Sequence, residues 1–93
     1  MAASAELVIR NKVGLHARPA AAFVKTAAGF KSRITVENLS RGTPAASARS
    51  ILSVLSAAVQ KDDTIRLIAE GEDETAAIAA LSELIETSFG EIE

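Results

Sequence analysis

The stretch Gly14–Ala21, with the sequence GLHARPAA, is the most informative part of this chain because a helix-like pattern begins inside it. From Ala17 to Ala28, apolar residues recur at the i, i+3, i+4, i+7 spacing of an amphipathic helix, namely Ala20, Phe23, Val24 and Ala27. Pro19 is compatible with this helix because the first helical turn does not use its N–H. Gly29 is expected to end the helix in the left-handed conformation. His16 is then predicted to lie at the N-cap or beside it.

His16 is the one histidine of the chain. A neutral imidazole is a nucleophile near pH 7, and the first amides of a helix bind anions because they lack intrahelical partners. Here those backbone amides belong to Ala17 and Arg18, and the Arg18 side chain adds a forked cation that suits a phosphoryl oxygen. Together these residues predict a phosphohistidine site. The alternative is an ordinary helix cap beside a solvated arginine.

Composition restricts the other function classes. The chain has 93 residues, 48% hydrophobic and 3% aromatic, and a net charge of −2. This size suits one domain with one core, whereas few aromatics and a negative charge give no basis for nucleic-acid binding. Without cysteine, disulfides are excluded, and a single histidine makes a metal site unexpected. With no signal peptide or membrane-spanning run apparent, we expect a cytoplasmic protein without membrane insertion.

Strand-like and turn-like segments surround the helix. Leu7–Ile9 is a short apolar run that predicts a strand, and Asn11–Gly14 is predicted to form a turn. Ile34 and Val36 alternate with polar residues, which predicts a second strand with one buried face. The segment 38–48 is interrupted by glycine and proline, and its pattern predicts no element.

The second half of the chain begins with another helix. Ser50 is predicted to be the N-cap of a helix over Ile51–Ala58, whose inward positions would be Ile51, Val54, Leu55 and Ala58. Lys61–Asp63 is predicted to form a turn and Thr64–Glu70 a strand.

A last helix is predicted to begin at Asp73–Thr75, where acidic residues favour the helix dipole, and to run to about Ser88. Helices thus alternate with strands, and the chain has no internal repeat or low-complexity linker. We therefore predict a single domain over residues 1–93, an α/β sandwich with helices on one face.

Three segments carry a resemblance to a known family. Gly14–Ala21 resembles the active-site segment of the HPr family, the histidine-containing phosphocarriers of bacterial phosphoenolpyruvate:sugar phosphotransferase systems. Arg49–Leu55 resembles that family's regulatory serine and apolar patch, and Gly71–Glu74 resembles its closing segment. The resemblance implies an α+β fold, an open-faced β-sandwich of order βαββαβα. It also implies a four-stranded antiparallel sheet, three helices on one face and a short third strand within residues 38–48.

The resemblance implies a phosphoryl carrier rather than an enzyme. His16 would accept the group on Nδ1 from enzyme I charged by phosphoenolpyruvate, with Arg18 assisting, and would pass it to IIA domains of sugar permeases. Ser50 would be phosphorylated by a regulatory kinase, HPr kinase/phosphorylase. As a residue pattern alone, Ser50 is also explained as a helix cap.

A partner surface is predicted on and around the second helix. It comprises an apolar part and two flanking cations: Ile51, Leu52, Leu55, Lys25 and Arg49. Leu52 lies off the inward stripe and is expected to be exposed. Two alanines depart from the family pattern, because a larger apolar residue and a glycine are common at positions 57 and 58. These departures concern recognition by the kinase and not the chemistry of His16.

No P-loop, acidic metal cluster or second histidine is present. The chain is therefore expected to use no cofactor and to take its phosphoryl group from a partner protein. Two other functions stay open, a regulatory or nitrogen-branch paralogue of the carrier and a binding module that docks a transcription factor. A shuttle that must leave its partners is expected to be a monomer with a small, transient interface.

Overall fold

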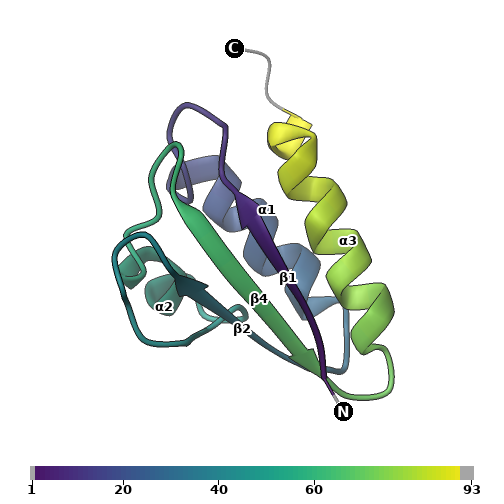
Figure 1. The fold of residues 1–93 in the computed structure, drawn as a ribbon. Coiled ribbons are helices and arrows are strands. Elements are labelled where there is room, and N and C mark those ends of the chain that lie inside the picture. The colour runs from purple at the N-terminus through teal and green to yellow at the C-terminus, as the bar shows by residue number, and fades with distance from the viewer. Residues whose placement is uncertain (1, 91–93) are drawn as a thin grey trace.

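The computed structural model describes residues 2–90, and its elements follow the predicted order (Figure 1). The strands are β1 (Ala3–Val8), β2 (Arg33–Asn38), β3 (Ala46–Ser47) and β4 (Thr64–Glu70). The helices are α1 (Ala17–Ala28), α2 (Ile51–Ser56) and α3 (Glu74–Glu86), followed by the 3₁₀ turn η1 (Ser88–Gly90). None of the helices within residues 2–90 is long and apolar enough to cross a membrane.

The strands form one antiparallel sheet in the order β1-β4-β2-β3. β4 is central, and its Ala69 lies opposite Ala3 of β1 and Ile34 of β2, which fixes the register on both sides. β3 pairs with β2 through Ala46 and Ser47, so β1 and β3 are the two edges of the sheet.

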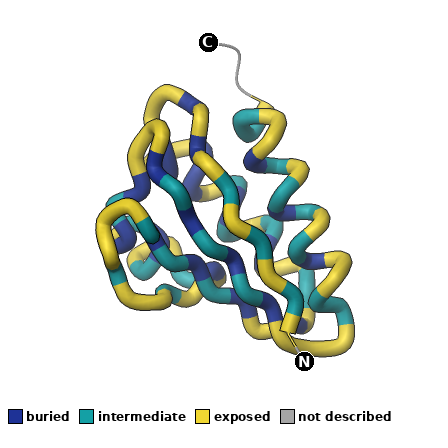
Figure 2. Tube along the Cα trace, in the orientation of Figure 1, coloured by how far each residue is buried: buried dark blue, intermediate teal, exposed yellow. Residues whose placement is uncertain are grey.

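The three helices cover one face of the sheet and leave the other face open (Figure 1). The core lies between these layers, and every described element contributes to it or packs against it, the short β3 through Ala46 and η1 through Phe89. Phe23 of α1, Val54 of α2 and Leu81 of α3 meet Val36 and Leu67 of the sheet, all fully buried. Burial of an apolar side chain of this size contributes about 1.5–3 kcal/mol. Figure 2 shows the resulting alternation of buried and partly buried positions along β4.

The predicted bounds of α1 and β4 are confirmed, whereas β1 is longer than predicted. β1 begins at Ala3 because it pairs with β4, although alanine and serine have weak strand propensity. Ile9, predicted to lie in this strand, comes just after it. Its side chain is nevertheless buried, and its N–H donates to the Asp63 carbonyl at 2.9 Å.

The prediction that Gly29 adopts the left-handed conformation is wrong. Gly29 has φ −76° and ψ −6°, which is a right-handed helical geometry. The N–H of Gly29 donates to Thr26 O at 3.1 Å, and that of Phe30 donates to Ala27 O at 3.2 Å. This tightened last turn satisfies the terminal carbonyls without a left-handed residue.

The second helix is shorter than predicted, and two of its inward positions are wrong. α2 ends at Ser56 because Ala58 has φ +52°, a left-handed geometry that no helix continues through. Ala57 is therefore buried in place of Ala58, which is only partly covered. Ile51 is 40% exposed, because the first turn of this short helix lies at the rim of the core. The inward position of Val54 is confirmed.

The connection between β2 and β3 is anchored to the turn before β4. Arg41 Nε lies 2.9 Å from Asp63 Oδ2, and the Asn38 amide donates to the same oxygen at 3.0 Å. The backbone N–H of Gln60 also donates to it, at 2.9 Å. Burial alone would raise the pKa of the Asp63 carboxyl, but these donors outweigh it and lower the pKa below its ordinary value. The connection is thus held by an ionised carboxylate.

Candidate functional site

His16 is the N-cap of α1, as predicted, with the extended backbone angles φ −130° and ψ 161°. Its ring is exposed and caps no backbone amide, so the imidazole is accessible. The segment before it is held firmly, because Leu15 is buried and its N–H donates to Val59 O at 3.0 Å. Gly14 permits this approach, since a Cβ on it would lie 2.3 Å from the same carbonyl oxygen. His16 is therefore presented from a fixed backbone.

Backbone amides at the start of α1 are left for a ligand. The N–H of Ala20 donates to His16 O at 3.4 Å, and Pro19 has no N–H. In this first turn the amides of Ala17 and Arg18 are the ones without an intrahelical acceptor. Ala17 has φ +50°, a conformation that costs a non-glycine residue about 1–2 kcal/mol. The start of α1 thus combines unpaired donors with a strained backbone beside the imidazole.

A cavity of about 460 Å³ opens beside the imidazole, lined by Lys12, Val13, His16, Gln60 and Lys61. Two of these residues are lysines, and none is acidic. The predicted cation Arg18 is exposed and does not line this cavity; within residues 2–90 its guanidinium makes no hydrogen bond or ion pair. The site therefore has cations on two sides, one at the helix start and others across the cavity.

Sequence reasoning missed Lys12 and Lys61 as site residues. Lys61 is far from His16 in the chain, and it reaches the cavity because the turn before β4 packs against the segment before α1. The N–H of Asp62 donates to Ile9 O at 2.6 Å, and Arg41 Nη2 donates to Gln60 Oε1 at 3.0 Å. The cavity wall formed by residues 60 and 61 is thus held from both sides.

Known proteins share this architecture. The family model described as "PTS HPr component phosphorylation site" matches residues 3–87. The chain belongs to the HPr family. A Phosphocarrier protein HPr of Xylella fastidiosa is 42% identical over 86 residues, which cover 92% of this chain and 93% of that protein. The crystal structure of HPr from Thermoanaerobacter tengcongensis has a TM-score of 0.92 at 45% identity, covering 98% of this chain and 99% of that chain.

Longer proteins contain HPr-like segments as well. The Multiphosphoryl transfer protein of Salmonella typhimurium is 42% identical over 88 residues, 95% of this chain, but the matched part is 23% of that protein's length. The chain thus spans about a quarter or less of the length of the multiphosphoryl transfer proteins that it matches, and the family shown is that of the HPr phosphocarriers of the phosphotransferase system. Among residues 2–90, no group of histidines, cysteines and carboxylates could hold a metal ion.

Ser50 is the N-cap of α2, as predicted. Its Oγ accepts a hydrogen bond from the N–H of Ser53 at 3.2 Å, and the N–H of Val54 donates to the Ser50 carbonyl at 2.9 Å. The residue is partly exposed, so the hydroxyl caps the helix at the surface of the molecule.

The predicted partner surface is only partly continuous. Leu52 is 76% exposed, which confirms that it lies off the inward stripe, and Ile51 is exposed beside it. Leu55 is half-buried and packs against the core, while Lys25 is exposed near the end of α1. Arg49 instead directs its guanidinium to backbone carbonyls before β2, away from the α2 surface.

Proposed function

We propose that His16 accepts a phosphoryl group from enzyme I charged by phosphoenolpyruvate and passes it to IIA domains of sugar permeases. The observation that carries this proposal is the exposed imidazole at the start of α1, beside two unpaired amides and a cavity with two lysines. The membership of the HPr family supports the same reaction class. The proposed location is the cytoplasm, where these partners would meet the carrier.

Transfer needs no cofactor. A ring nitrogen of His16, Nδ1 by resemblance to the family, attacks the phosphorus of the donor's phosphohistidine in line. The new N–P bond forms as the donor's N–P bond breaks, and the donor imidazole keeps the electron pair. The amides of Ala17 and Arg18 and the guanidinium stabilise the equatorial oxygens. A helix-terminus charge interaction is worth about 0.3–1 kcal/mol, which is small enough for the group to leave again.

Incubation with phosphoenolpyruvate and purified enzyme I tests this proposal. The expected product carries one acid-labile phosphoryl group per chain, visible as a phosphohistidine resonance by ³¹P NMR. His16→Ala should abolish it, whereas Ser50→Ala should leave it intact. Label that persists in His16→Ala would show that the phosphorylated residue is another one.

We also propose that phosphorylation of Ser50 regulates partner binding. The hydroxyl is accessible at the N-terminus of α2, where a phosphate suits the helix dipole, so the fold should persist. The added charge would lie close to the exposed Leu52 and weaken docking of an acidic partner. Incubation with HPr kinase and ATP tests this, and absence of phosphate that depends on Ser50 would refute it.

A regulatory paralogue would use the same site with different acceptors. Restoration of sugar uptake in a strain that lacks its carrier separates the two, because a regulatory protein would be phosphorylated without restoring uptake. A module that docks a transcription factor without phosphorylation would show no acid-labile phosphate at all.

A further inference from the structure

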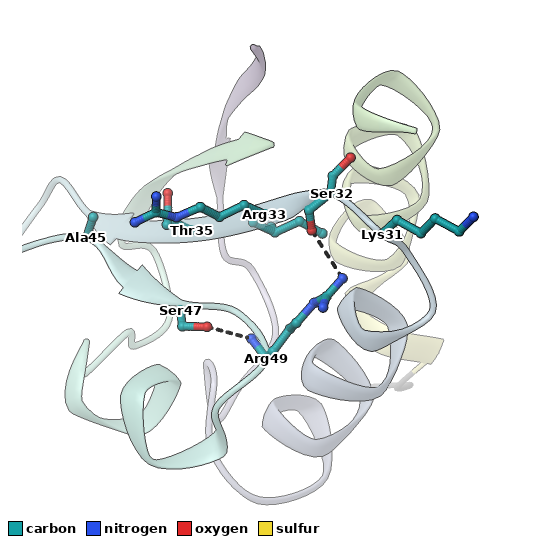
Figure 3. Close-up of a pocket in the computed structure, with 8 residues that line it drawn as sticks. Lys31, Ser32, Arg33, Thr35, Ala45, Ser47 and Arg49 are labelled. Atoms are coloured by element: carbon teal, nitrogen blue, oxygen red, sulfur yellow. Dashed lines mark hydrogen bonds between the residues drawn. The ribbon is translucent and has the colours of Figure 1, made fainter. Parts of the chain in front are cut away.

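A second cavity, of about 350 Å³, lies at the opposite end of α1 from His16, where the chain enters β2 and passes the β3 edge. Its polar lining residues are Lys31, Ser32, Arg33, Thr35, Ser47 and Arg49 (Figure 3). α1 has 12 residues, so about 18 Å of helix separates the two cavities. A ligand here would not overlap with the phosphohistidine site.

The charge of this cavity is opposite in sign to the net charge of the chain. Three of the lining residues are cations and none is acidic, although the net charge of the chain is −2. Arg33 stands on the open face of the sheet and, within residues 2–90, its guanidinium forms no ion pair or hydrogen bond. Glu70, opposite Arg33 in the β2–β4 register, makes no ion pair with it.

Arg66 provides the contrast on the same face of the sheet. It contacts two carboxylates, Glu6 at 3.2 Å and Glu37 at 3.7 Å, from the strands on either side. The open face thus neutralises Arg66 but leaves Arg33 unpaired at the rim of a cavity. An arginine in that position has its full donor fork available for an external anion.

Arg49 supplies a second guanidinium whose position is fixed. It donates to the carbonyls of Phe30 and, at 3.2 Å, of Ser32, and its backbone N–H donates to Ser47 Oγ at 3.3 Å. These bonds involve one terminal nitrogen of the side chain, so the other donors remain for a ligand. In Figure 3, Arg33 extends along β2 toward Thr35, Arg49 reaches Ser32, and Lys31 points away from both. The cavity therefore offers two separate guanidinium groups for anions instead of one.

We propose that this cavity binds a small phosphorylated metabolite with two anionic groups, one for each arginine. Guanidinium groups bind phosphate with charge-assisted hydrogen bonds, and the hydroxyls of Thr35 and Ser47 add neutral partners. Because the ligand lies away from His16, it binds the phosphorylated and unphosphorylated carrier alike. The proposal does not depend on which partner donates the phosphoryl group.

Titration of the ¹⁵N-labelled protein with inorganic pyrophosphate tests the proposal by NMR, with chloride at equal ionic strength as reference. Amide shifts should saturate at residues 31–35 and 45–49. Arg33→Gln should weaken pyrophosphate binding about tenfold, and Arg49→Gln should weaken it as well. Arg66→Gln, which removes the same charge from the same sheet face, should bind as the wild type does.

Three results would overturn the proposal. The first is saturable shifts confined to residues 16–18 and 60–61, since the anion would then occupy the phosphohistidine site. The second is equal weakening by Arg33→Gln and Arg66→Gln, which indicates attraction by overall charge. The third is the absence of saturation. Because Arg33 makes no internal bond in the described chain, Arg33→Gln tests binding without loss of a structural contact.

Discussion

The fold brings Lys61, a cation far from His16 in the sequence, to the cavity beside the imidazole. We predict that Lys61→Met lowers the equilibrium fraction of phosphorylated carrier, with a two- to fivefold smaller equilibrium constant for transfer from enzyme I. The reason is that an exposed charge near a phosphoryl group contributes about 0.3–1 kcal/mol. Quantitative ³¹P NMR measures this, and the effect should shrink at high salt.

Lys31→Met is the matched control for this prediction, because Lys31 is an exposed lysine beyond the other end of α1. It removes the same charge without touching the cavity at His16. An equal decrease of the transfer equilibrium constant in both variants would mean that Lys61 acts through net charge alone. Lys61 would then not belong to the site of His16.

Ala58 carries backbone strain that a single substitution should remove. Its φ of +52° costs a residue with a Cβ about 1–2 kcal/mol, whereas glycine adopts it freely. Part of this gain is offset by the greater entropy of glycine in the unfolded chain, about 0.4–1 kcal/mol. We therefore predict that Ala58→Gly raises the free energy of unfolding by about 0.5–1 kcal/mol, measured by urea denaturation.

Ala57→Gly is the control, since Ala57 is right-handed, with φ −71°, and buried. It should destabilise the protein, because glycine gains nothing there and loses a packed methyl group. Stabilisation by both variants, or by neither, would contradict the account of strain at Ala58.

At the scale of elements, two substitutions of Ser50 at the start of α2 distinguish the effect of losing the helix cap from the effect of adding negative charge. Ser50→Ala removes the acceptor for the N–H of Ser53 and should lower stability by about 1 kcal/mol. Ser50→Asp retains a capping oxygen and should be close to wild type in stability, but it adds negative charge beside Leu52. We predict that only Ser50→Asp slows phosphorylation by enzyme I, measured as the initial rate at limiting carrier.

The contacts of Asp63 that hold the β2–β3 connection to the turn before β4 should make the stability of the folded protein depend on pH in the acid range. The pKa of Asp63 is lower in the folded protein than its ordinary value, so this carboxylate contributes stability that is present above the unfolded pKa. That contribution is lost as the pH falls below about 4, toward the folded pKa. Asp63→Asn should therefore be less stable at pH 7 and show a shallower loss of stability below pH 5.

Asp62→Asn is the matched control, because Asp62 is exposed in the same turn and asparagine tolerates its φ of +73°. It removes a carboxylate from the same turn but keeps the hydrogen bonds of Asp63, so the acid-dependent contribution of Asp63 should still be present. Part of the loss of stability in acid should remain in both variants, because hydrogen bonds from Ser32 and Lys31 also lower the pKa of the Asp73 carboxyl. Equal profiles for Asp63→Asn and wild type would refute the prediction.

The sequence predicted those elements whose pattern is local. α1 and β4 were delimited correctly because their apolar periodicity is regular, and the N-caps His16 and Ser50 follow from the residues around them. The start of β1 and the whole of β3 are set by pairing with distant strands, which weak propensities in runs of alanine and serine do not reveal. Lys61 was missed for the same reason, because only the packed turn brings it to His16.

At the scale of the whole molecule, the open face of the sheet bears on the oligomeric state. Glu6, Arg66 and Glu37 form a row of opposite charges across three neighbouring strands. Charged residues on an exposed sheet disfavour association between copies. We predict that the 9.7 kDa chain sediments as a monomer. The triple variant Glu6→Leu, Glu37→Leu, Arg66→Leu, which replaces this charged row by apolar side chains, should show greater self-association. Analytical ultracentrifugation at several concentrations measures both, and a wild-type dimer would contradict the prediction.

Helices on a single side of the sheet also give the molecule two unlike surfaces. All chemistry proposed for His16 takes place at the helical layer, where partners must come and go. The bare side, which is the face of the sheet that no helix covers, is therefore separate from the proposed phosphoryl transfer. Substitutions on the bare side are expected to leave phosphoryl transfer unchanged, whereas substitutions on the helical side are expected to alter the rate of exchange with partner proteins.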